Sequence, residues 1–164
     1  MLASFIKLIN LPEKERKYII ECALAEKELA EKDEKEEDKN KYARKFIEYR
    51  FTSYTNAYLR LFLSNHLRAV FEIKGKRKTL YICECCGYKV LTLPGEWDIC
   101  KVCFWENDGS AKDESIISSS NRMTLGEAKK NFLDFGACYE GALRFLDKDR
   151  FLQFASDIEV PRTP

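Results

Sequence analysis

Apolar residues repeat at helical spacing early in the chain. After Pro12, a stripe with a period near 3.6 residues predicts a helix, and its members are Ile19, Ile20, Cys22, Ala23 and Leu24. The stripe gives way to mixed charge between Glu31 and Asn40, which predicts an exposed helix or a loop joining two helices. Before Pro12, a short apolar run is interrupted by Lys7 and followed by no small-residue cleavage site. We therefore expect a short amphipathic helix there and not a signal peptide.

A second helical stripe predicts one long helix from about Lys41 to about Arg68. Its apolar members are Ala43, Phe46, Ile47, Tyr54, Ala57, Tyr58, Leu61 and Phe62. The only histidine of the chain, His66, falls in this segment, and we expect it to be a packed or surface residue.

The period then changes from helical to alternating. Two strands are predicted on either side of Gly75, marked by Phe71 and Ile73 before the glycine and by Leu80 and Ile82 after it. This change of pattern places a domain boundary near Lys78. We predict a helical domain of unknown role over residues 1–78 and a second domain over residues 79–164.

The C-terminal third contains a helix with clear start and stop signals. Thr124 and Glu127 have the spacing of a capping box, and Gly136 is suited to the left-handed position after a helix. Between them lies an apolar stripe of Leu125, Ala128, Phe132 and Phe135. The following stretch, YEGALRFLDKDRFLQFASDI, predicts another helical segment, packed through Leu143, Leu146, Leu152 and Phe154.

Charge is divided unevenly between the two predicted domains. Residues 1–78 contain 18 Lys and Arg against 13 Asp and Glu, a net charge of +5, whereas residues 79–164 contain 10 against 14, a net charge of −4. Neither balance is basic enough to indicate a dedicated nucleic-acid domain. No apolar run approaches the roughly 20 residues that cross a bilayer, so we expect no membrane partner.

Five of the seven cysteines lie between Tyr81 and Gly109. Two residues separate Cys83 from Cys86, two separate Cys100 from Cys103, and 13 lie between the pairs. Each short spacing lets two thiolates point at one ion, which predicts a single structural zinc bound by these four cysteines. Iron in a rubredoxin-like centre would use the same ligands. Paired metal-type spacing without a signal peptide predicts a reducing, cytoplasmic location.

The fifth cysteine of the cluster, Cys85, lies inside the first pair. Adjacent residues rarely aim at one metal, so we expect Cys85 to be a small side chain packed beside the turn. The alternative is a low-pKa thiol activated by zinc. Nucleophilic cysteine needs a base, and the sequence shows none nearby.

The segments CECCGY, PGEWDICKVCFWENDG and NRMTLGEAKKNFLDFGAC resemble the bacterial cysteine-rich CPCC domain family over roughly residues 81–138. Members of that family carry a CPCCGY turn, an ICPVCFWEDDG turn and a helix ending in FGA. The resemblance implies a small zinc-ribbon domain with no established enzymatic activity, and it places all five clustered cysteines at family positions. The chain departs from the family at Glu84 and Lys101, where the family has prolines. Neither position supplies a metal ligand.

We therefore expect an α+β protein. An α-helical N-terminal domain would be followed by a small zinc-ribbon (rubredoxin-like) β domain of the CPCC type with C-terminal helices.

The residues around the second cysteine pair give little indication of a catalytic site. Four acids flank this pair: Glu96, Asp98, Glu106 and Asp108. We find no histidine or serine at hand for acid–base work, so we expect these acids to be exposed loop residues. Trp97, Phe104 and Trp105 are expected to cover the ribbon, and part of that aromatic surface is an alternative docking patch. Four cysteines leave zinc no open position. No phosphate loop, dinucleotide fingerprint or catalytic triad pattern is present.

Three classes of function follow, in decreasing order of support. The first is protein binding, because CPCC-type domains resemble small proteins from bacterial toxin–immunity neighbourhoods, which implies an immunity protein whose acidic half inhibits a basic toxin. The second is a nucleic-acid-binding zinc-ribbon regulator that uses KGKRK and KNKYARKFIEYRFTSY; the acidic ribbon weighs against it because phosphate repels acids. The third is an enzyme, which would have to use Cys85 or the loop acids without visible partners.

Overall fold

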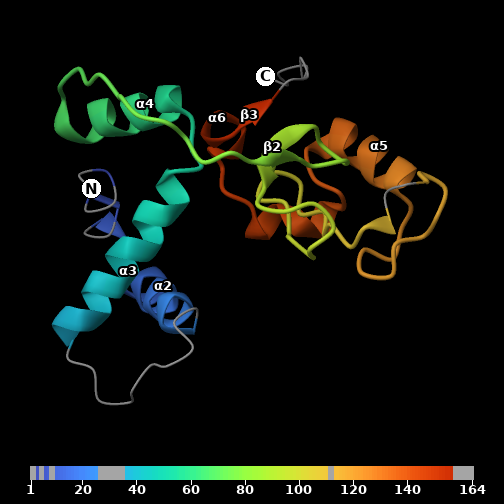
Figure 1. Cartoon of the computed structure of the whole chain (residues 1–164), viewed down its shortest axis with the longest axis horizontal. Helices are drawn as coiled ribbons and strands as arrows, with labels where there is room; N and C mark the ends of the chain where they lie inside the picture. The colour runs from blue at the N-terminus through green and yellow to red at the C-terminus, as the bar shows by residue number, and fades with distance from the viewer. Residues whose placement is uncertain (1–2, 4–5, 8–9, 26–35, 111–112, 157–164) are drawn as a thin grey trace. The chain divides into compact units, whose positions relative to one another are not determined.

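A computed structural model describes residues 3, 6–7, 10–25, 36–110 and 113–156 (Figure 1). The chain divides into an N-terminal unit, Met1–Lys76, and a C-terminal unit, Arg77–Pro164. Helices occur together with a three-stranded antiparallel sheet, so the predicted α+β class is confirmed. Among the described residues, no helix has both the length and the apolar character that a bilayer crossing requires.

The N-terminal unit contains the helices α2 (Glu13–Ala25), α3 (Glu36–Phe51) and α4 (Asn56–Leu67). The helix α2 begins after Pro12, whose carbonyl accepts a hydrogen bond from the Arg16 N–H at 2.9 Å. A small core forms where α3 buries Ala43 and Ile47, against which the partly buried side chains of Leu11, Ile19, Ile20 and Phe51 pack. Of the predicted helix before Pro12, the described residues Ala3, Ile6, Lys7 and Asn10 are helical, and the Asn10 side chain donates to the Ile6 carbonyl at 2.9 Å. Within the predicted Glu31–Asn40 run, residues 31–35 lie outside the described residues, whereas residues 36–40 belong to α3.

The prediction of one helix over about residues 41–68 is wrong, because the chain turns between Phe51 and Asn56. The Thr52 hydroxyl donates to the carbonyl of Tyr49 at 2.6 Å, and the Thr55 hydroxyl caps α4 by accepting the Tyr58 N–H at 3.0 Å. The apolar period survives this break because rings from both helices pack together, with centroids of Phe51 and Phe62 5.8 Å apart. Threonine competes with helical backbone bonding and so favours such a cap over a helix interior.

The described sheet has the order β1 (Tyr81–Ile82), β2 (Tyr88–Leu91) and β3 (Ala155–Ser156). The strand expected around Phe71 and Ile73 is absent, since residues 70–73 form no ladder. β3 was not expected: it pairs with β2 through Tyr88 opposite Ser156 and Lys89 opposite Ala155. The C-terminal segment thereby returns to the first cysteine turn, which β1 and β2 flank.

The helix α5 (Leu125–Phe135) forms as predicted. Thr124 and Glu127 make the reciprocal capping box, and Gly136 adopts φ 83° at the C-terminal end. Leu125, Ala128 and Phe132 are buried.

The stretch after α5 differs from the prediction of one helical segment. It contains a 3-10 helix, η2 (Glu140–Phe145), and a single helical turn, α6 (Arg150–Gln153). Phe154 is buried as expected, but Leu143 and Leu152 are 37% and 54% exposed. Short, irregular elements do not hold apolar residues on one buried face.

Candidate metal centre

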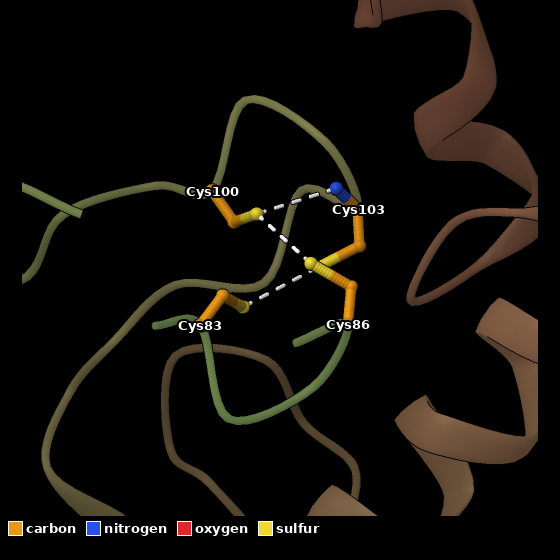
Figure 2. Close-up of side chains that lie close together, drawn as sticks. All are labelled: Cys83, Cys86, Cys100 and Cys103. Carbon is orange, nitrogen blue, oxygen red and sulfur yellow. Dashed lines mark hydrogen bonds between the residues drawn. The ribbon is translucent and has the colours of Figure 1, made fainter. Parts of the chain in front are cut away.

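Four buried sulfurs meet in the C-terminal unit (Figure 2). The structure brings together the side chains of Cys83, Cys86, Cys100 and Cys103, whose sulfur atoms all lie within 4.8 Å of one another. The Sγ atoms of Cys83 and Cys103 are 3.6 Å apart, and those of Cys86 and Cys100 are also 3.6 Å apart. These four cysteines are positioned to hold one metal ion.

The two cysteine turns are built alike. In the first, the Gly87 N–H donates to the Cys83 carbonyl at 2.8 Å and the Cys83 N–H donates to the Tyr88 carbonyl at 2.9 Å. In the second, the Phe104 N–H donates to the Cys100 carbonyl at 2.9 Å, and the Cys100 N–H donates to the Trp105 carbonyl at 2.8 Å. Each turn therefore presents its first and fourth residues, both cysteines, to the same point.

Both turns need a left-handed residue directly after the second cysteine. Gly87 and Phe104 each have φ 72° at this position. Glycine adopts it without a steric penalty, whereas a residue with a side chain pays about 1–2 kcal/mol. Packing offsets this cost at Phe104, whose ring stacks on Phe145 at 5.3 Å and meets Tyr139 edge-on at 6.1 Å.

The sulfur geometry fits a tetrahedral thiolate site. Zinc–sulfur bonds of about 2.3 Å in a tetrahedron place neighbouring sulfurs about 3.8 Å apart. The two sulfur–sulfur separations of 3.6 Å are close to this value. Soft thiolate ligands in a tetrahedral arrangement select zinc or iron–sulfur chemistry over magnesium or calcium.

Backbone amides favour a thiolate at Cys100. Its Sγ atom accepts the N–H groups of Val102 at 3.3 Å and Cys103 at 3.4 Å. Burial opposes ionisation of Cys100, but hydrogen bonds from Cys103, Cys83 and Cys86 hold its pKa well below the usual range. Burial raises the pKa of Cys86 and of Cys103. A cation bound by the four sulfurs would replace the protons of these thiols.

Arg150 is a buried cation beside the second turn, and the sequence analysis missed it. Its guanidinium donates to the carbonyls of Val102 at 3.0 Å, Asp147 at 3.1 Å and Gly136 at 3.3 Å. Burial lowers the pKa of Arg150, while the charges of Asp147 and Cys103 oppose that effect. A metal held by four thiolates would carry a net negative charge, and a buried positive charge beside the second turn would stabilise it.

Two further cysteines lie next to the cluster. Cys85 is only 6% exposed, and it is one of the neighbouring thiols that raise the pKa of Cys103 after burial, the largest cause. Cys138, which spacing alone did not connect to the site, is 1% exposed and donates its N–H to the Cys103 carbonyl at 2.7 Å. Burial, followed by the charges of Cys85, Cys100 and Cys83, raises the pKa of Cys138 to about 12. Cys138 is therefore a protonated packing residue at neutral pH.

Two of the predicted loop acids have structural partners. An Asp98 carboxylate oxygen accepts the Thr92 hydroxyl and the Thr92 N–H, the latter at 2.6 Å. Asp108 accepts the Ser110 N–H at 3.0 Å and the hydroxyls of Ser110 and Ser118 at 2.6 and 2.7 Å. Burial opposes these ionisations, but the hydrogen bonds hold the pKa of both aspartates below the ordinary value.

The remaining predicted site residues divide between buried and exposed positions. Trp105 is buried at 1% exposed, as expected of a side chain that packs on the ribbon, but Trp97 is 58% exposed. Glu96 is exposed and Glu106 is half-buried. His66 is exposed on α4, where its ring lies 4.3 Å from that of Phe62, so it belongs to the N-terminal unit and not to the cysteine cluster.

The two departures from the family pattern lie between the cysteines. The Lys101 side chain is exposed, whereas Glu84 is partly buried and its Oε2 atom has no hydrogen-bond partner. Burial raises the pKa of Glu84, and the neighbouring charges of Cys83 and Asp108 act in the same direction. A raised pKa limits the negative charge that Glu84 adds beside the thiolates.

Comparison with known proteins supports the resemblance. A family model described as "Cysteine-rich CPCC" matches residues 81–150, a segment that includes all four clustered sulfurs and ends at Arg150. No curated protein and no solved structure gave a match to the chain. Residues 81–150 therefore match the cysteine-rich CPCC family, as the resemblance predicted.

Proposed function

We propose that this protein is a non-catalytic, zinc-binding protein that acts by binding another protein. Zinc would be held by Cys83, Cys86, Cys100 and Cys103, with one ion per chain. When bound, it would supply folding free energy to a unit whose own sheet is very small. Four buried sulfurs complete a tetrahedral shell, which leaves no position for a substrate or an activated water. This closed ligand set is the observation that carries the non-catalytic proposal.

An exposed aromatic surface supports the second half of the proposal. Phe104, Tyr139 and Phe145 pack ring against ring, and we call this group the aromatic patch. Tyr139 is 38% exposed and Phe145 56% exposed. Arg144 lies over the Phe145 ring at 4.6 Å. Aromatic residues and arginine are enriched in interface cores, so the patch suits a protein partner.

A basic toxin is the partner that the charge of this half favours. Residues 79–164 carry a net charge of −4, and resemblance to toxin–immunity proteins points the same way. Charged rims speed association with an oppositely charged partner. Glu140, next to Tyr139, and Glu96 are exposed and suited to such a rim. Asp98 and Asp108 are poor rim residues, because their carboxylates are committed to hydrogen bonds within the fold.

Affinity capture with a matched pair of variants tests this function. The captured protein would be purified and its binding measured against wild type, Phe145→Ser and Leu133→Ser. Leu133 is 68% exposed on α5 and lies outside the patch, so its variant removes an equally exposed apolar side chain. We expect Phe145→Ser alone to weaken binding, by a factor of ten or more for a residue worth over about 1.4 kcal/mol.

Charge reversal at Glu96 and Glu140 should lower the association rate and flatten its salt dependence, with little change in dissociation. Zinc content should not change in any of these variants. Equal binding by all variants, or a turnover that Cys85→Ser abolishes, would contradict the proposal.

A further inference from the structure

Basic side chains concentrate in one segment of the N-terminal unit's sequence. Between residues 41 and 76 the sequence has eight Lys and Arg against two acids, a net charge of +6. All eight side chains are exposed, and we call them the basic surface: Lys41, Arg44, Lys45, Arg50, Arg60, Arg68, Lys74 and Lys76. The helix α2 of the same unit carries three basic and three acidic residues and is neutral.

Both acids of this segment already have basic partners within it. Glu48 lies 3.7 Å from Arg44, and Glu72 lies 3.0 Å from Lys74. The first turn of α3 is acidic in sequence, so the basic stretch begins one turn later, at Lys41. Positive charges that lie close together repel one another unless negative charges spread over a similar length neutralise them. A chain of phosphates has this property.

On α3, exposed lysines share a face with a tyrosine. Lys41, Lys45 and Tyr49 are spaced four residues apart and lie on the side of the helix opposite the buried Ala43 and Ile47. Tyr49 is 53% exposed. Phosphate-binding lysines next to an exposed ring are the combination that holds single-stranded nucleic acid, because the ring can stack on an unpaired base.

A hollow of about 540 Å³ lies beside Arg60, between α4 and the residues that follow it. Its walls are formed by Asn56, Ala57, Arg60, Val70, Phe71, Glu72 and Ile73. An unpaired base splayed from its strand can enter such a space and find both apolar contact and polar edges. The bases of a duplex cannot, because they are stacked inside the helix.

We propose that the basic surface of the N-terminal unit binds single-stranded nucleic acid. Its lysines and arginines contact phosphates, and Tyr49 stacks on a base. An anionic membrane is a less suitable partner, since a helix that lies on lipid needs its apolar face for the bilayer. The apolar face of α3 is instead occupied by Leu11, Ile19 and Ile20.

The test is fluorescence anisotropy with labelled 20-nucleotide RNA and DNA single strands, using the full zinc-loaded chain over a range of salt concentrations. The logarithm of affinity should fall linearly with that of salt concentration, by about 0.7 per phosphate contact. Replacing Lys41, Lys45 and Lys76 by Gln should reduce this slope by about 2 and weaken binding on the order of 100-fold at 0.1 M salt. Tyr49→Ala should weaken binding without changing the slope.

The matched control replaces Lys14, Arg16 and Lys17 of α2 by Gln, which removes the same net charge from exposed positions of the same unit. This variant should bind like the wild type, and so should Phe145→Ser, which separates this result from that of the protein-binding proposal. Equal loss in both triple variants, no binding at 50 mM salt, or preference for phosphatidylserine vesicles or a duplex would overturn the inference.

Discussion

Replacing Arg150 by Met should destabilise the C-terminal unit far more than replacing any exposed arginine. The side chain is 9% exposed and donates to three backbone carbonyls, those of Val102, Gly136 and Asp147. A hydrogen bond from a charged group contributes about 1.5–3 kcal/mol. These three bonds share one guanidinium and are not additive, so we expect a loss of about 3–5 kcal/mol.

The assay is urea unfolding of the zinc-loaded protein at fixed free zinc, followed by the fluorescence of the buried Trp105. Arg144→Met is the matched control, because Arg144 is exposed and its guanidinium lies over the ring of Phe145. Its loss should cost less than about 1 kcal/mol. Arg150→Lys should fall between the two, since it keeps the charge but not the planar fork. If Arg150→Met and Arg144→Met were equally mild, the reasoning about the buried guanidinium would be refuted.

Three other predictions concern the metal centre and its surroundings. Cys85→Ser should retain zinc, whereas Cys86→Ser should lose it and unfold the C-terminal unit, because structural zinc supplies folding free energy on the order of 10 kcal/mol. Native mass spectrometry of both variants tests this prediction. Equal metal loss from the two variants would mean that the ligand is misassigned. Asp108→Asn should cost about 1–2 kcal/mol at pH 7, while Glu96→Gln should be neutral. The pKa of Asp108 is lower in the folded protein than in the unfolded chain. The stability that the ionised Asp108 contributes is therefore fully present above the unfolded-state pKa of about 3.9 and is lost as pH falls through the folded-state pKa. A difference in stability between wild type and Asp108→Asn that persisted below that range would contradict this prediction. Zinc chelation should expose Trp105 while most of the helical circular dichroism persists, since α2 and α3 have their own core and α4 packs on α3 through Phe62 against Phe51. Loss of the entire helical signal would argue against this.

Elements with local signals could be predicted from the sequence. The helix α5 is defined by Thr124, Glu127 and Gly136, all within a few residues of its ends. The pairing of the cysteines in two turns is likewise local, because it depends on a two-residue spacing. The Asp108–Ser110 hydrogen bond is also local, since aspartate commonly accepts bonds from the residue two positions later, but our sequence analysis overlooked Ser110.

Features that depend on distant contacts could not be predicted in this way. The strand β3 pairs with β2 across more than 60 residues, and Ala155 and Ser156 carry no β signal of their own. Arg150 and Cys138 reach the second cysteine turn from far along the chain. The break before α4 could not be predicted for a different reason. Phe51 and Phe62 pack together across the break, so the apolar period of the sequence continues where the helix stops.

X-ray absorption at the zinc edge tests the central claim most directly. A closed structural centre formed by Cys83, Cys86, Cys100 and Cys103 predicts four sulfur neighbours at about 2.3 Å and no lighter atom in the first shell. The spectrum should not change on addition of cell extract or in Cys85→Ser. A nitrogen or oxygen neighbour would reveal an open or differently ligated site, and iron in place of zinc would assign the centre to redox chemistry; either result would contradict the account.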